Sequence, residues 1–288
     1  MRQQTILVSV SLLVVGMIAT QIGASMAKGL FPLVSATGAT ALRLTLAAII
    51  LSVLFRPWRY RLDRAQWRAV LLYGGSMGTM NLLFYSALAT IPLGVAVAIE
   101  FIGPLAVALA GSRKPVDFLW VGLAVLGLLV LLPIGQISGD LDPVGVMLAF
   151  GAGACWAAYI VFGQRASAGG GAHTAALGVS LAALIILPLG IASAGTALIQ
   201  PAILPMALGV ALLSSAIPYA IDMMVLPHLP ARTYGILMSA EPALAAMSGF
   251  VILAEHLSLL QTVGIVAIVL ASIGATMTIS RNTAPPAA

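Results

Sequence analysis

The stretch Val121-Gly-Leu-Ala-Val-Leu-Gly-Leu-Leu-Val-Leu-Leu132 decides the fold class of this chain. Each of its residues is apolar or glycine, and no polar residue interrupts the run. A strand of a membrane barrel would instead alternate polar and apolar side chains over about ten residues. Comparable runs follow one another along the sequence, so we predict an all-α integral membrane protein.

The composition supports this prediction. Only 7% of the 288 residues are charged and 61% are hydrophobic, whereas soluble domains carry about 25% charged residues. A spanning helix takes about 20 residues, which leaves room for roughly nine to eleven spans. The apolar runs predict ten transmembrane helices, at residues 5–23, 36–55, 67–88, 93–110, 117–135, 143–163, 173–193, 203–225, 233–254 and 259–279.

The basic residues predict the orientation, because loops rich in Lys and Arg stay in the cytoplasm. If Arg2 is cytoplasmic, the arginine-rich loop 56–68 is cytoplasmic too, and so are both termini. Of the 13 Lys and Arg, only Lys28 and Arg43 fall elsewhere. We expect Lys28 to anchor the outer end of the first span. The net charge of +5 therefore reflects topology and does not predict a nucleic-acid partner.

The sequence contains an internal repeat. Gly94–Glu100 aligns with Gly235–Glu241 at an offset of 141 residues, and 41–48 aligns with 176–183 at the similar offset of 135. Each half holds five spans, so the second copy enters the membrane from the opposite face. Inverted repeats place a substrate site near the bilayer midplane, where they meet. The two predicted five-helix repeats are residues 5–135 and 143–280.

Two acidic residues, Glu100 and Glu241, lie within these aligned apolar runs. A carboxylate near the middle of a bilayer costs about 2.5 kcal/mol or more, so its retention indicates a function. Both residues are expected roughly 10–12 Å deep, approaching the midplane from opposite sides. Pro104 and Pro242 lack an N–H and should leave a carbonyl unpaired near each acid, which suits an ammonium or a proton. The alternative role is a protonated carboxyl that packs helices together.

Four further polar residues in the spans are candidates for the site. Arg43 could snorkel to the outer surface, pair with Glu100, or bind a substrate carboxylate bidentately. Asp222 matches Asn81 at the same offset of 141 residues, and Tyr219 precedes Asp222 by three positions. Polar residues at the same aligned position in both halves are consistent with a cavity that the two halves share. Interhelical hydrogen bonds, worth about 0.6–2 kcal/mol each, are the alternative role.

Other features indicate packing rather than chemistry. The small residues at four-residue spacing from Gly145 to Gly153 predict close helix contacts. No nucleotide-binding, hydrolase or metal-binding motif occurs in the sequence, so no enzyme activity, cofactor or metal is predicted. Three aromatic residues within the spans are expected to pack or to lie at the membrane interface: Tyr85, Trp156 and Tyr159.

The ten spans, with Glu100 four residues before Pro104 and Glu241 directly before Pro242, resemble the EamA-type branch of the drug/metabolite transporter superfamily. The resemblance covers nearly the whole chain and implies export of small amino acids, such as threonine and homoserine, across a bacterial inner membrane by proton exchange. One departure is Asp222, which stands where the amino-acid exporters of this branch have Glu. The stretches that resemble those exporters are residues 23–32, 92–109, 151–156 and 238–246.

These features together predict a mechanism of alternating access with a zwitterionic amino acid bound at the midplane. Arg43 would bind its carboxylate, and Glu100 would bind its ammonium and, after release, a proton. Glu241 would act in gating or have only a structural role at the position that corresponds to Glu100. Asn81, Tyr219 and Asp222 would line the cavity and meet the substrate hydroxyl.

Two alternatives stay open at this point. The first is an exporter of other cargo, such as aromatic amino acids or cationic drugs, although Arg43 argues against cations. The second is a membrane-embedded enzyme or a passive channel. A channel would need no proton-titrating pair of acids.

Overall fold

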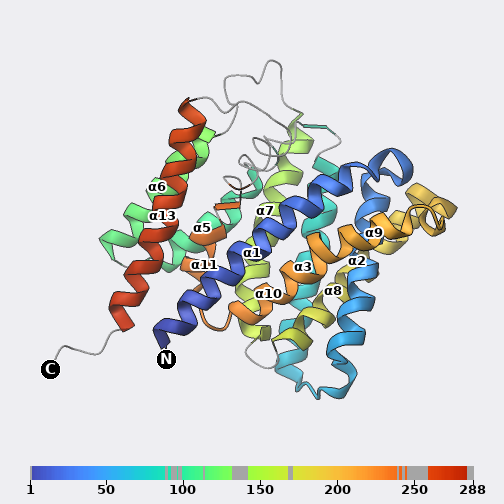
Figure 1. Ribbon diagram of the computed structural model, residues 1–288, viewed down its shortest axis with the longest axis horizontal. Coiled ribbons are helices and arrows are strands. Elements are labelled where there is room, and N and C mark those ends of the chain that lie inside the picture. The colour runs from blue at the N-terminus through green and yellow to red at the C-terminus, as the bar shows by residue number, and fades with distance from the viewer. Residues whose placement is uncertain are drawn as a thin grey trace.

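The computed structural model shows a bundle of helices (Figure 1). It describes residues 2–87, 90–91, 96, 99–112, 114–131, 142–167, 171–238, 240–241, 244 and 259–283. No strand occurs in this described part of the chain. The elements are α1 (Arg2–Lys28), α2 (Phe31–Phe55), η1 (Pro57–Arg59), α3 (Arg64–Ala87), α5 (Ile102–Gly111), α6 (Pro115–Leu131), α7 (Pro143–Ser167), α8 (Ala172–Ala194), η3 (Gly195–Ile199), α9 (Leu204–Ala211), the π-helical η4 (Leu212–Ala216), α10 (Ile217–Val225), α11 (Ala231–Met238) and α13 (Leu259–Thr283).

Every one of the ten predicted spans contains described helix, which confirms the all-α membrane architecture. Among the described residues, four segments are long and apolar enough to cross a membrane: Phe31–Phe55, Pro143–Ser167, Ala172–Ile199 and Leu204–Val225. The predictions for Gly94, Pro242 and the side chain of Lys28 lie outside the described residues.

Polar side chains cap two of the helices where they leave the membrane. Before α3, Asp63 Oδ1 accepts the Gln66 N–H at 2.7 Å and Gln66 Oε1 accepts the Asp63 N–H at 3.1 Å. This reciprocal pair is a capping box, which satisfies two backbone donors of the first turn. Before α7, the N–H groups of Val144 and Gly145 each donate to Asp142 at 3.2 Å. The bond from Val144 is the main cause that lowers the pKa of the Asp142 carboxyl.

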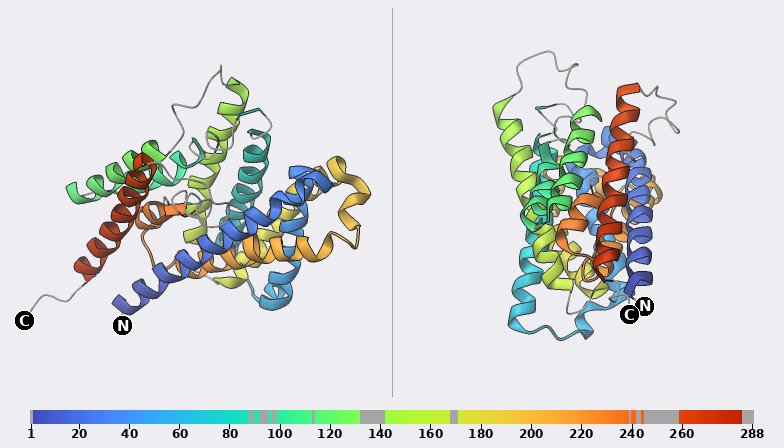
Figure 2. Two further views of the ribbon diagram at one scale, coloured as in Figure 1. Left: turned by 45° about the horizontal axis from the view of Figure 1, so that its top comes forward. Right: turned by 90° about the vertical axis from the view of Figure 1, so that its left-hand side faces the viewer.

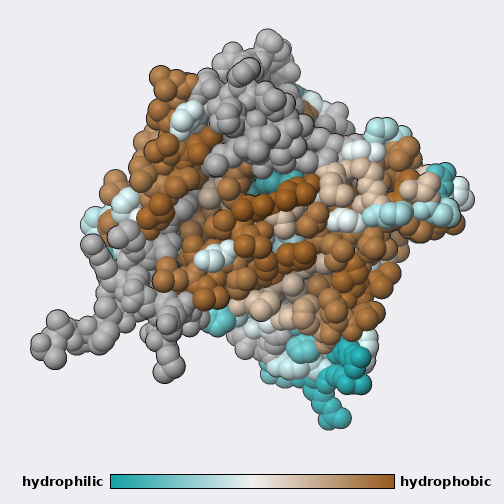
Figure 3. Space-filling model, in the orientation of Figure 1, coloured by the Kyte–Doolittle hydropathy of each residue, from teal (hydrophilic) through white to brown (hydrophobic). Residues whose placement is uncertain are grey.

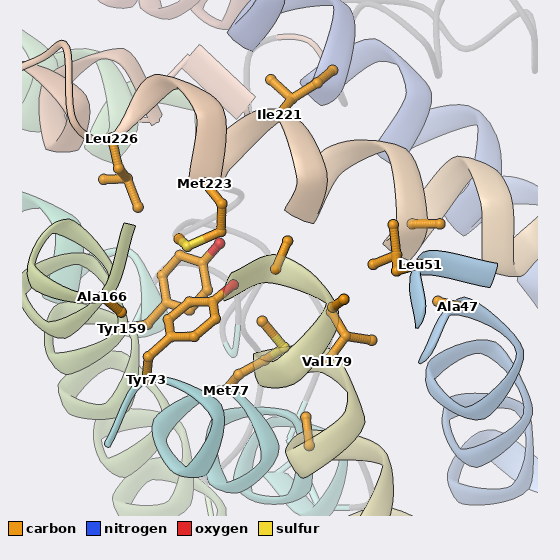
Figure 4. Close-up of a cluster of buried hydrophobic side chains, with 14 of the residues drawn as sticks. Ala47, Leu51, Tyr73, Met77, Tyr159, Ala166, Val179, Ile221, Met223 and Leu226 are labelled. Carbon is orange, nitrogen blue, oxygen red and sulfur yellow. The ribbon is translucent and has the colours of Figure 1, made fainter. Parts of the chain in front are cut away.

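The helices pack in pairs that are far apart in sequence. α2 lies against α8, α3 against α7, α5 against α11, and α6 against α13. α1 crosses the molecule along α9 and α10, while α6 and α13 stand together at one side (Figures 1 and 2). The largest core cluster includes Tyr73, Met77, Tyr159, Met223 and Leu226 (Figure 4).

The outer surface of the bundle is apolar. Leu126 is 61% exposed and Leu184 is 67% exposed. Figure 3 shows a mostly hydrophobic face, with hydrophilic residues gathered at the end where α2 joins α3. A broad apolar surface of this kind fits contact with lipid.

Glycines bring α5 and α7 into backbone contact beside Glu100. A Cβ atom added at Gly103 would lie 2.0 Å from the Gly153 carbonyl oxygen, and one added at Gly153 would lie 2.8 Å from the Glu100 carbonyl oxygen. Both distances are shorter than a van der Waals contact, so a larger residue would push the helices apart. The predicted close packing of the Gly145–Gly153 stretch is thereby confirmed at Gly153, and it fixes the backbone of Glu100.

Candidate functional site

All six candidate residues line one cavity of about 210 Å³. The cavity lies between α1, α2, α3, α7, α10 and the segments that carry the two glutamates. Residues from both halves of the sequence therefore converge on one place. The candidates are Arg43, Asn81, Glu100, Tyr219, Asp222 and Glu241.

Arg43 of α2 is held in the cavity by neutral groups. Its Nη1 donates to the Ser214 carbonyl and to Ser215 Oγ, both at 3.2 Å, and its Nη2 donates to Asn81 Oδ1. The Tyr85 ring centroid lies 6.0 Å from its Cζ. Arg43 forms no ion pair with any carboxylate in the described part of the chain, and its buried Nε has no acceptor there. Snorkelling and pairing with Glu100 are thus not observed, and the cationic head faces the cavity.

Asn81 of α3 links Arg43 to the backbone. Its Oδ1 accepts from Arg43, while its Nδ2 donates to the Met77 carbonyl at 2.9 Å. The side chain is only 4% exposed. Both ends of the Asn81 amide are therefore engaged in the protein itself, so its main effect is to orient the guanidinium.

Asp222 of α10 is bound by a tyrosine from another helix. The Tyr159 hydroxyl of α7 donates to Asp222 Oδ2 at 2.6 Å. The Tyr159 ring lies 5.0 Å from that of Tyr73 and 6.2 Å from that of Tyr219, between centroids. Figure 4 shows the rings of Tyr73 and Tyr159 side by side near Met223.

The prediction that the aromatic residues pack is confirmed for Tyr159 and Trp156, but it missed their position at the cavity. Tyr85, Trp156 and Tyr159 all line the cavity. Trp156 and Tyr159 lie three positions apart on α7, so one face of the helix presents both. That spacing was the available signal, but it also fits ordinary packing. The role of Tyr159 depends on contact with a residue 63 positions away.

The two glutamates approach the cavity from α5 and α11. Glu100, just before α5, is 8% exposed, and Glu241 lies shortly after α11. Neither carboxylate forms a hydrogen bond with the described residues, and they are close enough to repel each other when both are ionised. The Glu100 carbonyl that Pro104 leaves without its helical donor lies against Gly153. It is therefore packed against α7, and no hydrogen bond to it is found among the described residues.

The sequence is similar to a transporter family and to named bacterial exporters. Residues 143–277 match the EamA-like transporter family. The chain is 53% identical over 281 residues to the threonine/homoserine exporter RhtA of Salmonella typhimurium, covering 98% of this chain and 95% of the relative. It is 52% identical over 282 residues to the threonine/homoserine exporter RhtA of Escherichia coli, covering 98% and 96%.

A solved structure is also similar in fold. One crystal structure superimposes with a TM-score of 0.74 over 98% of this chain and 100% of its own length, at 18% sequence identity. At that identity the likeness concerns the fold alone.

Proposed function

Since the chain belongs to the EamA-like transporter family, we propose that it exports small amino acids, threonine and homoserine among them, in exchange for protons. Family membership makes it a multi-pass inner-membrane transporter and not an enzyme. Relatives that share more than half of its residues over nearly its whole length are named as threonine/homoserine exporters, which supports the choice of cargo.

The observation that carries the proposal is the separation of charges in the cavity. Arg43 presents a cation held only by neutral acceptors, while Glu100, Asp222 and Glu241 present carboxylates to the same space. A zwitterionic amino acid carries the complementary pair of charges. Arg43 binds its carboxylate and Glu100 its ammonium, so each charge of the substrate offsets a charge that the protein keeps out of water.

The size of the cavity favours a small cargo. Sites for drug-sized ligands occupy about 300–1,000 Å³, whereas this cavity measures about 210 Å³. Tyr219 and Asp222 line it and can meet a substrate hydroxyl. Its aromatic wall, with Tyr85 and Trp156, is the one feature that would favour an aromatic amino acid instead.

Proton coupling follows from competition for one carboxylate. Glu100 is nearly buried and forms no hydrogen bond with the described residues, so either an ammonium or a proton must neutralise it. The nearby Glu241 raises the cost of leaving both acids ionised. When the substrate leaves to the outside, a proton takes its place and is carried inward.

The pattern of helix contacts supports an inverted repeat of residues 5–135 and 143–280. In such a repeat α1 corresponds to α7 and α3 to α10. The contact of α3 with α7 then has the contact of α10 with α1 as its counterpart, and both contacts are present. Exchanging the two halves maps each of three pairs onto itself: α2 with α8, α5 with α11, and α6 with α13. The family match to residues 143–277 falls within the second half.

Alternating access is supported by the core beside the cavity. Tyr73, Met223, Leu226 and Tyr234 pack behind Tyr159 and are fully buried. With both termini in the cytoplasm, these residues lie on the cytoplasmic side of Asp222. They close that side while the cavity extends toward Ala27, near the outer end of α1.

A flux assay in proteoliposomes tests the proposed function. Vesicles loaded with radiolabelled threonine, homoserine or phenylalanine are diluted into buffer at equal or at lower pH. We expect efflux of threonine and homoserine that accelerates when the outside is acidic. Preference for phenylalanine would favour the aromatic cargo, and efflux indifferent to the pH gradient would contradict proton exchange and favour a channel.

A further inference from the structure

The π-helical turn η4 interrupts the helical segment 204–225 beside Arg43. In this turn the Ile217 N–H donates to the Leu212 carbonyl, five residues back. The next residue, Pro218, has no N–H, and its ring would collide with the carbonyl four residues earlier in a regular α-helix. That carbonyl belongs to Ser214. The wider turn relieves the collision, and π-turns of this kind occur frequently at functional sites.

The carbonyl that Pro218 cannot bond is the one that Arg43 uses. Arg43 Nη1 donates to the Ser214 carbonyl and to Ser215 Oγ, each at 3.2 Å. Ser215 is completely buried, so its hydroxyl faces the guanidinium instead of lipid. The Ser214 hydroxyl has a different partner, the Val210 carbonyl at 2.7 Å. The two adjacent serines therefore have separate roles.

The turn also packs closely against α1. A Cβ atom added at Gly23 would lie 2.6 Å from the Ser214 nitrogen and 2.8 Å from its Cβ. Only glycine allows α1 to approach this closely. The turn therefore packs closely against α1 and also contacts the guanidinium.

We propose that the turn Leu212–Ala216 is a positioning element that fixes Arg43 for the carboxylate of the substrate, with Ser215 as its positioning residue. Arg43 is pinned by neutral acceptors from two other helices, η4 and α3, so its orientation is set without neutralising its charge. An anion that enters the cavity thus meets a preorganised, uncompensated cation. This inference rests on the proposed function, because it specifies how that function selects substrates with a free carboxylate.

Kinetics of adjacent serine variants test the proposal. Ser215→Ala removes an acceptor of Arg43, whereas Ser214→Ala removes only the bond to Val210 and keeps the carbonyl contact. We expect Ser215→Ala to raise the KM for threonine about tenfold with little change in maximal rate, and Ser214→Ala, which keeps the carbonyl contact with Arg43, to raise it clearly less. Pro218→Ala restores the N–H that can occupy the Ser214 carbonyl, so it should resemble Ser215→Ala.

Threoninamide, which keeps the ammonium and hydroxyl but lacks the carboxylate, gives the specific readout. Its inhibition of threonine transport should be unchanged in Ser215→Ala, so discrimination between the two compounds falls about tenfold. Equal losses in Ser214→Ala and Ser215→Ala would overturn the proposal, because the turn would then act only as structure.

Thermal unfolding in detergent tests the contact without any cargo. If Ser215 acts through Arg43, Ser215→Ala should lower the melting temperature in the wild-type background but not in Arg43→Gln. Ser214→Ala should shift it equally in both backgrounds. If Ser215→Ala lowered the melting temperature equally in the wild-type and Arg43→Gln backgrounds, the positioning role would be contradicted, even if the protein carried another substrate. Absence of threonine transport in the wild type would contradict the proposed function alone.

Discussion

Tyr159 donates a hydrogen bond of 2.6 Å to Asp222 across the interface between α7 and α10. Because this bond orients the carboxylate in the cavity, Tyr159→Phe should leave Asp222 without its donor. We expect threonine transport to fall several-fold and the protein to lose about 0.6–2 kcal/mol of stability, the usual value of such a bond in a membrane. Flux in proteoliposomes and thermal unfolding measure the two effects.

A double-mutant cycle provides the control for Tyr159→Phe. In the Asp222→Asn background the hydroxyl no longer faces a carboxylate, so removing it should cost less than in the wild type. If the stability losses of the two single variants simply added up in the double variant, the Tyr159 hydroxyl would not act through Asp222.

Glu100 and Glu241 line one cavity but should differ in their effect on proton coupling. Glu100→Gln cannot release a proton, so acidifying the outside should no longer accelerate threonine efflux, although downhill exchange of threonine continues with a higher KM because the amide does not pair with the substrate ammonium. Glu241→Gln is the matched control and should keep its response to the pH gradient. Efflux from proteoliposomes with and without the gradient measures both. If the responses were reversed, Glu241 would be the coupling carboxylate.

The architecture was predictable because bilayer thickness sets the length of each apolar run. For the same reason the ionisable residues in those runs stood out, and all six candidates line the cavity. The contacts that hold these side chains in place could not be predicted from the sequence. Arg43 and Ser215 are 172 positions apart, and serine is ordinary in a membrane helix. The one local signal in the sequence was Pro218, because a proline interrupts the regular helical hydrogen bond to the Ser214 carbonyl.

The approach of α5 to α7 should make Gly153 sensitive to the smallest substitution. Gly153→Ala places a methyl group 2.8 Å from the Glu100 carbonyl oxygen, and overpacking of this kind costs about 1–3 kcal/mol. Gly122→Ala on α6 meets nothing within 4 Å and should stabilise its helix by about 0.5–1 kcal/mol. Thermal unfolding of both variants should therefore shift in opposite directions. A neutral Gly153→Ala would contradict the close crossing.

The predicted orientation can be read from two exposed positions, Arg59 and Gln200. Five predicted spans separate them, so they must lie on opposite sides of the membrane. In a Cys155→Ser background, which removes the single cysteine, a membrane-impermeant maleimide should label Gln200→Cys in intact spheroplasts. It should label Arg59→Cys only after the cells are opened, because the arginine-rich loop faces the cytoplasm. The reverse pattern would invert the orientation, whereas labelling of both variants from one side would contradict the count of spans between them.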